Sequence, residues 1–369
     1  MGEIRTFEEA HIPEVAAMEL KVFHGRRQPA GPALQSYFEE IFFRNPWRDE
    51  ALPSLVYIHG ERVVGFLGVI PRRMIFRGRP VRVAVATQFM VDTSAYRGGA
   101  GLELIRRFFA GPQDLSLTDG ATEAAHAVWT AAGARAAQLY ALQWIRVLRP
   151  ARHLRGMLRA RPRMPGVLRV AARCGAPVCA LADAVLSRLP LRAFAPPRTE
   201  CASHTADAKG IFECAMEIGW REPLKPCYDP ASFRWLIAQA AEARRHGALR
   251  TAVVRAPGGA PAGWYAYFAK RGGESIVLQL GAAGRHFEGV FQALLRDAWE
   301  HGSTAVSGQA IPRFLLNLSN QRCLFRYVGN GVLAHSRDPE LLGCILQGDA
   351  ALTRLDGEWW TRFAIGDWD

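Results

Sequence analysis

Lysine, paired cysteines and long apolar runs are scarce or absent in this sequence. Only four lysines occur, so arginine carries nearly all of the positive charge. The seven cysteines are odd in number and form no C-x-x-C pair, which argues against a disulfide framework or a zinc site and favours a reducing compartment. No apolar run reaches 18 residues without a charge, and the start MGEIRTFEEA lacks the order of a signal peptide. We expect a cytoplasmic protein without a transmembrane helix.

The length of the chain predicts two domains. A chain of 369 residues is longer than one hydrophobic core usually supports. We expect domains over residues 1–150 and 206–369, separated by an insert over 151–205. The first half predicts helices, then an antiparallel meander, then a strand, a helix and a strand, which is typical of α+β or mixed α/β folds. A similar order returns about 200 residues later and indicates duplication.

Periodicity and turn residues predict the individual elements. In the first half, strands are expected at 4–7, 54–58, 62–70, 73–76, 81–91, 115–119 and 138–147. The helices of that half are expected at 13–23, 34–43, 102–109 and 121–132. In the second half, strands are expected at 250–256, 263–270, 274–280 and 304–308, and helices at 207–218, 231–245 and 287–302. The strand at 138–147 is expected to close the first domain.

A glycine-rich turn follows the strand that ends near Val91. Small residues occupy Gly98, Gly99, Ala100 and Gly101 directly before the helix begins, and Arg97 adds a positive charge. Unpaired amides at a helix start suit a phosphate group, and small side chains let it approach. The turn matches neither G-x-G-x-x-G nor the G-K-[ST] ending of a P-loop. From these residues alone, a phosphate cradle and a simple flexible corner both remain open.

In context, VDTSAYRGGAGLELI resembles the acyl-CoA-binding signature of the GNAT acyltransferase superfamily, in which a strand leads to R-G-x-G-x-G/A at a helix start. Arg97, Gly98 and Gly99 match the first three positions. Ala100 stands where the family usually has Gly, and Leu102 stands where the family usually has Gly or Ala. GERVVGFLGV is similar to the family's central hairpin, and TEAAHAVWTAAGA is similar to the family's helix before the last strands. The resemblance covers residues 3–150 well and 206–335 faintly.

The resemblance implies two tandem GNAT-like domains, with mixed central sheets flanked by helices and an Arg-rich helical insert between them. It implies an acyl-CoA-dependent N- or O-acyltransferase that uses acetyl-CoA or another acyl-CoA and no metal. Backbone groups of Phe89, Met90 and Val91 would serve the thioester, and residues Arg97, Gly98, Gly99, Ala100, Gly101 and Leu102 would hold the diphosphate. A non-catalytic binding protein and a FemAB-like transferase that takes aminoacyl-tRNA are the alternatives.

The second half offers a weaker turn at the equivalent junction. Gly281 and Gly284 are present, but Arg285, His286 and Phe287 follow them where an open turn would be needed. We expect the N-terminal half to bind CoA and the C-terminal half to serve as scaffold or substrate wall.

Acyl transfer needs a base for the acceptor and an acid for the leaving thiolate. Asp119, Glu123 and His126 are the nearest titratable residues for the base, and Tyr140 lies where the family often supplies the acid. Each has a structural alternative: Asp119 could cap the next helix, His126 could be a half-buried helix residue, and Tyr140 could be a core tyrosine. No Ser, His and Asp constellation with motif support is present.

The sequence RLDGEWWTRFAIGDWD near the C-terminus combines three tryptophans with Glu358, Asp367 and Asp369. Glu358, Trp359 and Trp360 could bind a sugar ring by stacking and hydrogen bonding, or the tryptophans could anchor this segment against the core. Similar stretches occur in GNAT proteins of bacterial polysaccharide modification, which implies an amino sugar or glycan precursor as the acceptor.

Most of the formal net charge of +12 lies between positions 146 and 198, a range that covers most of the insert and contains twelve arginines and one acidic residue, Asp183. Short helices are expected at 166–174 and 177–189, the second with an apolar stripe. Contact of 151–198 with an anionic membrane, docking of an acidic carrier protein and an ordinary linker all remain open. Nucleic acid is not expected because aromatic residues for base stacking are nearly absent there. Membrane contact would place the protein at the inner face of the membrane.

Overall fold

The computed structural model describes residues 2–159, 175–188, 195–328 and 332–361. The chain forms two compact units, and each contains segments from both halves of the sequence. Unit 1 comprises Met1–Ala141, Arg221–Glu242 and Val328–Asp369, and unit 2 comprises Leu142–Trp220 and Ala243–Tyr327. These units cut across the boundaries at 150 and 205 that the sequence suggested.

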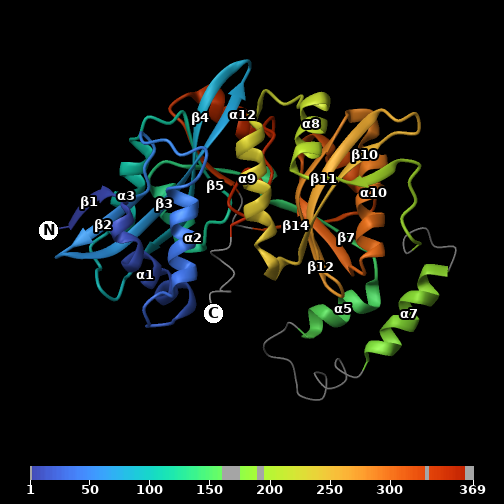
Figure 1. Cartoon of the computed structure of the whole chain (residues 1–369), viewed down its shortest axis with the longest axis horizontal. Helices are drawn as coiled ribbons and strands as arrows, with labels where there is room; N and C mark the ends of the chain where they lie inside the picture. The colour runs from blue at the N-terminus through green and yellow to red at the C-terminus, as the bar shows by residue number, and fades with distance from the viewer. Residues whose placement is uncertain (1, 160–174, 189–194, 329–331, 362–369) are drawn as a thin grey trace. The chain divides into compact units, whose positions relative to one another are not determined.

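Unit 1 is built on a mixed sheet of eight strands (Figure 1). In spatial order they are β1 (Gly2–Thr6), β2 (Leu55–His59), β3 (Arg62–Phe76), β4 (Arg79–Val91), β5 (Leu115–Thr118), β15 (Val332–His335) and β6 (Arg135–Ala137), with β9 (Leu224–Pro226) beside β3. The pair β4 and β5 is parallel, and the other neighbours are antiparallel. Its helices are α1 (Ile12–His24), α2 (Pro32–Phe42), α3 (Ala100–Phe109), α4 (Glu123–Ala131), α9 (Pro230–Ala241) and α12 (Pro339–Gln347).

Unit 2 has a seven-stranded sheet with the same arrangement. Its strands in matching order are β8 (Ala202–Thr205), β10 (Ala248–Arg255), β11 (Pro261–Ala269), β12 (Glu274–Ala282), β13 (Ala305–Gln309), β7 (Leu142–Val147) and β14 (Leu324–Tyr327). Again only the fourth and fifth strands are parallel. Its helices are α5 (Pro150–Arg159), α7 (Ala176–Arg188), α8 (Ala208–Ile218), α10 (Phe287–Glu300) and α11 (Leu315–Asn320).

The two halves of the sequence exchange one strand. In unit 1, β15 from the second half lies between β5 and β6, and in unit 2, β7 from the first half lies between β13 and β14. The expectation that the segment 138–147 closes the first domain is therefore wrong. Its first residues form a 3-10 turn, Gln138–Ala141, and β7 then joins the sheet of unit 2.

A single long strand replaces two predicted ones in the meander. The sequence predicted separate strands at 62–70 and 73–76, yet β3 runs through both, with the intervening Pro71 opposite Ala84 of β4. Proline removes a backbone donor, so it fits a strand only where one edge is unpaired. On the other edge of β3, pairing with β2 ends at Leu67 and pairing with β9 starts at Met74, so Pro71 lies in the gap.

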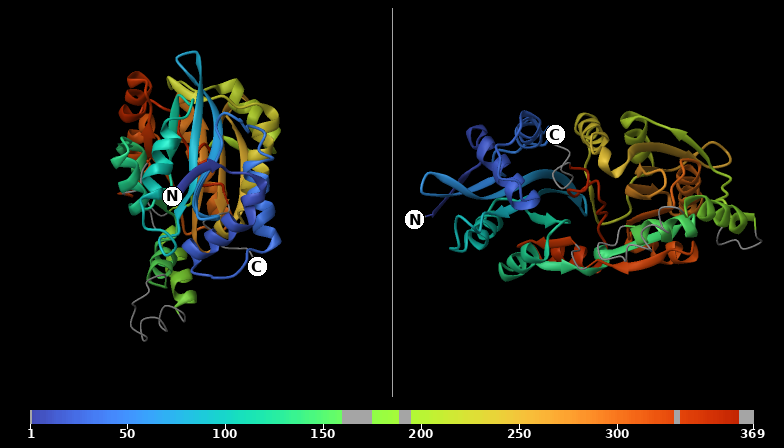
Figure 2. Two further views of the ribbon diagram at one scale, coloured as in Figure 1. Left: turned by 90° about the vertical axis from the view of Figure 1, so that its left-hand side faces the viewer. Right: turned by 90° about the horizontal axis from the view of Figure 1, so that it is seen from below.

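Helices cover both faces of the sheet of unit 1. The side chains of β3 alternate between the two faces, so this strand contacts helices on each side. On one face, Phe66 packs against Phe38 and Phe42 of α2. On the other face, Leu67 belongs to a buried cluster with Leu104 of α3. Figure 2 shows α1 and α2 on one side of the sheet and α3 on the other. This double cover holds the carboxyl end of β4 and the start of α3 in fixed positions.

The strand exchange predicts that neither half of the sequence folds alone. Fragment 1–197 lacks β15, so β5 and β6 would have unpaired edges, and its β7 would have no sheet to join. We expect each of the fragments 1–197 and 198–369 to lack a cooperative thermal transition by circular dichroism, and the two together to copurify as a 1:1 complex. Cooperative unfolding of isolated 1–197 would contradict this expectation.

Candidate functional site

The glycine turn joins the end of β4 to the start of α3 and leaves its amides unpaired. Gly99 has φ +84° and caps the helix from the left-handed region, which a side chain would strain. Its carbonyl accepts the amides of Leu102 and Glu103. Among the described residues, no acceptor faces the amides from Gly98 to Gly101. Four donors at the positive end of a helix therefore lack a partner within the described part of the chain, and such an arrangement suits an anion.

Beside this turn, β4 and β5 part from each other. Their parallel pairing covers only three residue pairs and ends at Val85 opposite Leu117. The register between β3 and β4 then shifts near Gln88, a residue with φ +51°. Such a bulge bends the strand and is common next to functional sites. Residues Phe89, Met90 and Val91 follow the bulge, so among the described strands the edge of β4 toward β5 has no partner there.

The equivalent junction in unit 2 has a different structure. After β12, a 3-10 turn covers Gly284–His286, and α10 follows. The amide of His286 donates to Ala283, and that of Phe287 donates to Gly284. Because the turn satisfies its own amides, it offers fewer donors to a ligand than the junction in unit 1.

A pair of carboxyl groups lies where β4 and β5 separate. One oxygen of Glu358 accepts the hydroxyl of Thr87 on β4 at 2.6 Å, and the other accepts that of Thr118 on β5 at 3.4 Å. The backbone amide of Glu358 donates to the carboxylate of Asp119 at 2.9 Å. Any side chain at Gly120 would collide with Glu358, and any at Gly357 would collide with Asp119. The contact thus requires glycine on both segments.

The surroundings of this pair favour protonated carboxyl groups. Burial, followed by the charge of Glu358, raises the pKa of Asp119 to about 8. Burial also raises the pKa of Glu358, against the hydroxyls of Thr87 and Thr118, which lower it. Both residues are half-buried. A carboxyl group that titrates near neutral pH can act as a general base or acid.

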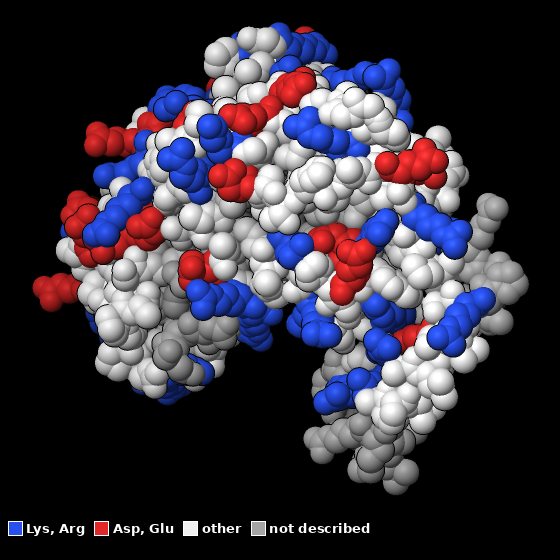
Figure 3. Space-filling view, turned by 45° about the vertical axis from the view of Figure 1, so that its right-hand side comes forward, with Lys and Arg blue, Asp and Glu red and all other residues white. Residues whose placement is uncertain are grey.

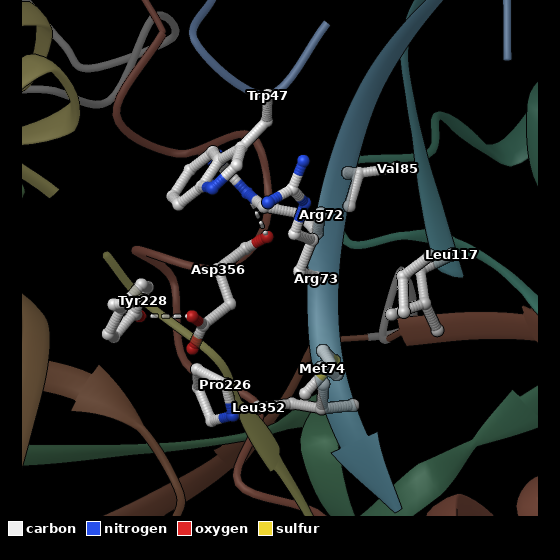
Figure 4. A pocket seen from close by; sticks show the side chains of 11 residues that line it. Trp47, Arg72, Arg73, Met74, Val85, Leu117, Pro226, Tyr228, Leu352 and Asp356 are labelled. Atoms are coloured by element: carbon white, nitrogen blue, oxygen red, sulfur yellow. Dashed lines mark hydrogen bonds between the residues drawn. The ribbon is translucent and has the colours of Figure 1, made fainter. Parts of the chain in front are cut away.

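A buried arginine lies beneath the same C-terminal segment (Figure 4). The guanidinium of Arg72 is 4.3 Å from the ring of Trp47 and 5.2 Å from that of Trp360. Its two terminal nitrogens have no hydrogen-bond partner among the described residues, and burial lowers its pKa to about 10. Nearby, Asp356 accepts the hydroxyls of Tyr228 and Thr353. The cavity here, about 10 Å³, holds at most one water molecule and is too small for a substrate. The contacts of Arg72 and Asp356 therefore serve to hold the C-terminal segment in place.

The other predicted catalytic residues lie in different environments. Tyr140 is buried, and its hydroxyl donates to the carbonyl of Ala350 at 2.6 Å and accepts the amide of the same residue at 2.9 Å. Burial raises its pKa. Glu123 is exposed in the first turn of α4, where a carboxylate suits the helix dipole. The cap of that helix is Thr122, so Asp119 is not the cap, and His126 is half-buried on α4.

The structure brings together Asp119 and Glu358, which the sequence had placed in separate roles. Trp359 is close to them, since its indole donates to the carbonyl of Asp119 and its ring lies 4.3 Å from Arg354. Trp360 is fully buried against Trp235, so it anchors the segment and cannot stack on a substrate. Asp367 and Asp369 lie outside the described residues.

Sequence reasoning missed Thr87, Thr118 and Arg72. Thr87 and Thr118 are ordinary strand residues in the sequence, and Arg72 is one arginine among many. The signal that could have found Arg72 is its place inside an apolar strand, where a charge needs a partner. Within the described ranges, no group of His, Cys, Asp or Glu side chains is arranged to hold a metal ion.

Comparison with known proteins gives the fold a name. No model of a protein family and no curated protein sequence matches this chain. Its structure is similar to a GCN5-related N-acetyltransferase from Anabaena variabilis (TM-score 0.57, 12% identity, 92% of this chain and 74% of that one). It is also similar to one from Kribbella flavida (0.54, 14%, 92% and 72%). A third similar structure is Saccharomyces cerevisiae N-myristoyltransferase with bound myristoyl-CoA and inhibitors (0.50, 12%, 90% and 79%).

At these identities the likeness concerns the fold. The predicted class, a mixed α/β protein with mixed sheets flanked by helices, is confirmed, and so is the resemblance of the architecture to GCN5-related N-acetyltransferases.

The carboxyl pair predicts a pH-dependent stability. Asp119 has a raised pKa when folded, so between about pH 4 and 8 the folded protein holds a proton that the unfolded chain releases, and stability falls as pH rises through that window. Glu358→Gln removes the neighbouring charge. We expect the difference in melting temperature, variant minus wild type, to be more positive at pH 8.5 than at pH 5. The exposed Glu340→Gln is the control, and an equal pH slope in wild type and Glu358→Gln would contradict the prediction.

The two hydrogen bonds of Tyr140 predict a structural role. In Tyr140→Phe the amide and carbonyl of Ala350 lose their buried partner, which costs about 1–3 kcal/mol. Chemical denaturation measures this loss, and Tyr327→Phe, which removes an exposed hydroxyl, should leave stability unchanged. If the free energy of unfolding of Tyr140→Phe equals that of the wild type, the structural role of the hydroxyl is refuted.

Proposed function

We propose that this protein is an acyl-CoA-dependent N- or O-acyltransferase whose cofactor site lies in unit 1. The observation that carries the proposal is the set of unpaired amides from Gly98 to Gly101, at the start of α3 and beside the open end of β4. A diphosphate needs several converging donors and a positive helix end. Arg97 adds a charge at the same turn. The fold supports acyl-CoA as the donor, because a similar structure contains bound myristoyl-CoA.

In this proposal Asp119 is the general base and Glu358 sets its pKa. The Asp119 carboxylate takes a proton from the acceptor amine or hydroxyl, whose nitrogen or oxygen bonds to the acyl carbon as the carbon–sulfur bond breaks. The leaving thiolate then receives the proton that Asp119 has taken up, which restores the carboxylate. Backbone groups from Phe89 to Val91 stabilise the thioester oxygen. Tyr140 has no role in this scheme, because its hydroxyl bonds both the carbonyl and the amide of Ala350. Glu123 stays a second choice for the base.

The acceptor is proposed to be a small molecule or glycan precursor with an amine or hydroxyl, such as an amino sugar. Glu358 and Trp359, both partly exposed beside Asp119, are the residues that support this assignment. A carboxylate with an adjacent indole face suits a sugar ring that carries an amine. Acetyl-CoA is the first acyl donor to test, and longer acyl-CoAs follow.

Unit 2 is proposed to be a scaffold without a cofactor of its own. Its turn at Gly284–His286 uses its own amides internally, and Arg285 and His286 directly precede α10, whereas Gly98 and Gly99 directly precede α3. The matching strand order of the two sheets supports an origin by duplication, after which one site was lost.

A non-catalytic CoA-binding protein is the second candidate, and one observation favours it. Glu358 bridges Thr87 and Thr118 at the point where β4 and β5 part. A carboxylate held there could block the thioester as well as assist the acceptor. Binding of acetyl-CoA without release of CoA thiol in a panel of amino sugars and amines would favour this candidate.

A matched pair of glycine variants tests the cofactor site. Gly99 and Gly259 both have φ +84° and open space around the missing side chain, so glutamate strains the backbone equally at both. Only Gly99→Glu places a carboxylate beside the unpaired amides. We expect it to weaken acetyl-CoA binding at least tenfold, about 1.4 kcal/mol, in calorimetric titration, whereas Gly259→Glu binds like the wild type. Equal binding by both variants, or none by the wild type, would refute the proposal.

A further inference from the structure

Helices α5 and α7 of unit 2 turn their large apolar side chains outward. On α7, Val178 is 69% exposed and Leu181 68%, and Val185 continues the same stripe at helical spacing. On α5, Leu154 and Met157 are more than half exposed. Globular proteins normally bury this face of a helix. A helix that shows it to solvent over two turns indicates a surface that meets another apolar phase.

The only acidic residue of these two helices holds this arrangement in place. Asp183 on α7 is buried and accepts the amides of Ala151 at 2.8 Å and Arg152 at 3.2 Å, at the N-terminus of α5. Its carboxylate also pairs with the side chain of Arg152 at 3.4 Å. Negative charge at a helix N-terminus is stabilising. The hairpin of α5 and α7 is therefore a defined structure, and the inward acid leaves its outer surface with positive charge alone.

Arginine supplies that positive charge. Arg149, next to α5, is used internally, since its guanidinium lies 4.2 Å from the ring of Trp299 and donates to the carbonyl of that residue. Arg159 and Arg188, at the ends of the two helices, are exposed. Figure 3 shows basic and uncharged side chains over most of this projecting part of unit 2. The described hairpin thus combines an apolar stripe with flanking guanidinium groups.

We propose that the hairpin of α5 and α7 binds the surface of an anionic phospholipid membrane. The stripe from Val178 to Val185 enters the boundary between headgroups and acyl chains, and the arginines contact lipid phosphates. Among the described residues, no helix is long and apolar enough to cross a bilayer. An acidic protein would satisfy the arginines, but five exposed aliphatic side chains on two helices fit a lipid interface better than a highly charged partner. The inference is independent of the proposed enzymatic activity.

Vesicle sedimentation with the full chain tests the proposal. We expect binding to phosphatidylcholine vesicles that contain about one third phosphatidylglycerol, weaker binding at roughly 0.5 M salt, and no binding to phosphatidylcholine alone. Arg159→Glu/Arg188→Glu should weaken binding at least about 25-fold, because each arginine near an anionic surface contributes about fivefold. Val178→Asp/Leu181→Asp should abolish it.

Control variants carry one substitution of the same kind outside the hairpin. Leu316 on α11 is 81% exposed, so Leu316→Asp introduces a charge at an equally accessible aliphatic position outside the hairpin. Arg62→Glu reverses an exposed arginine on β3. Both should bind vesicles like the wild type. No binding to anionic vesicles, equal effects of hairpin and control variants, or binding only to an acidic protein such as polyglutamate would each overturn the proposal.

Discussion

This structure depends on the backbone hydrogen bonds of two strands, β15 and β7. Each of them pairs within the sheet that the other half of the sequence mainly forms. A strand between two neighbours must satisfy donors and acceptors along both of its edges. In unit 1 those edges belong to β5 and β6, and the strand that fills the gap comes about 195 residues later in the chain. The exchange also brings the segment that follows β15 back to the first sheet, and Glu358 is on that segment.

The candidate site owes its form to an interruption of regular structure. The parallel pair β4 and β5 stops after three residue pairs, and the bulge at Gln88 bends β4 away. Two threonines at this opening point their hydroxyls at Glu358, and the glycines on either side let Asp119 and Glu358 approach each other. Burial raises the pKa of both carboxyl groups, and the charge of Glu358 raises that of Asp119 further, while Arg72 and Arg354 keep positive charge nearby. The same geometry that ends the sheet therefore brings together two carboxyl groups with raised pKa values.

Local patterns predicted most elements of the fold, because turn residues and periodicity act over short stretches. The glycine turn, α3 and the helix from Pro177 were all found within a few residues, and the repeated element order is matched by the two sheets. The partner of β7 could not be predicted, since a strand's sequence specifies its two faces and not its neighbour. Residues 166–174, expected to form a helix, lie outside the described ranges.

The site was predictable only in part, for the same reason. Asp119 and Glu358 were each identified as polar residues at suggestive positions, yet 239 residues separate them. Their contact depends on the strand exchange, which no short motif encodes. Conversely, Tyr140 and Trp360 looked chemically useful in the sequence, but their burial and hydrogen bonds give them the role of anchors.

The late position of β15 also has a consequence for synthesis on the ribosome. Residues 1–141 emerge well before residue 332, with β5 and β6 already present, but the strand that joins them is translated about 195 residues after β6. Until then the nascent chain displays open sheet edges, which are prone to pair with other chains and which chaperones recognise. A product that terminates before β15 would lack both that strand and Glu358. Such a polypeptide would therefore lack the pair of carboxyl groups as well.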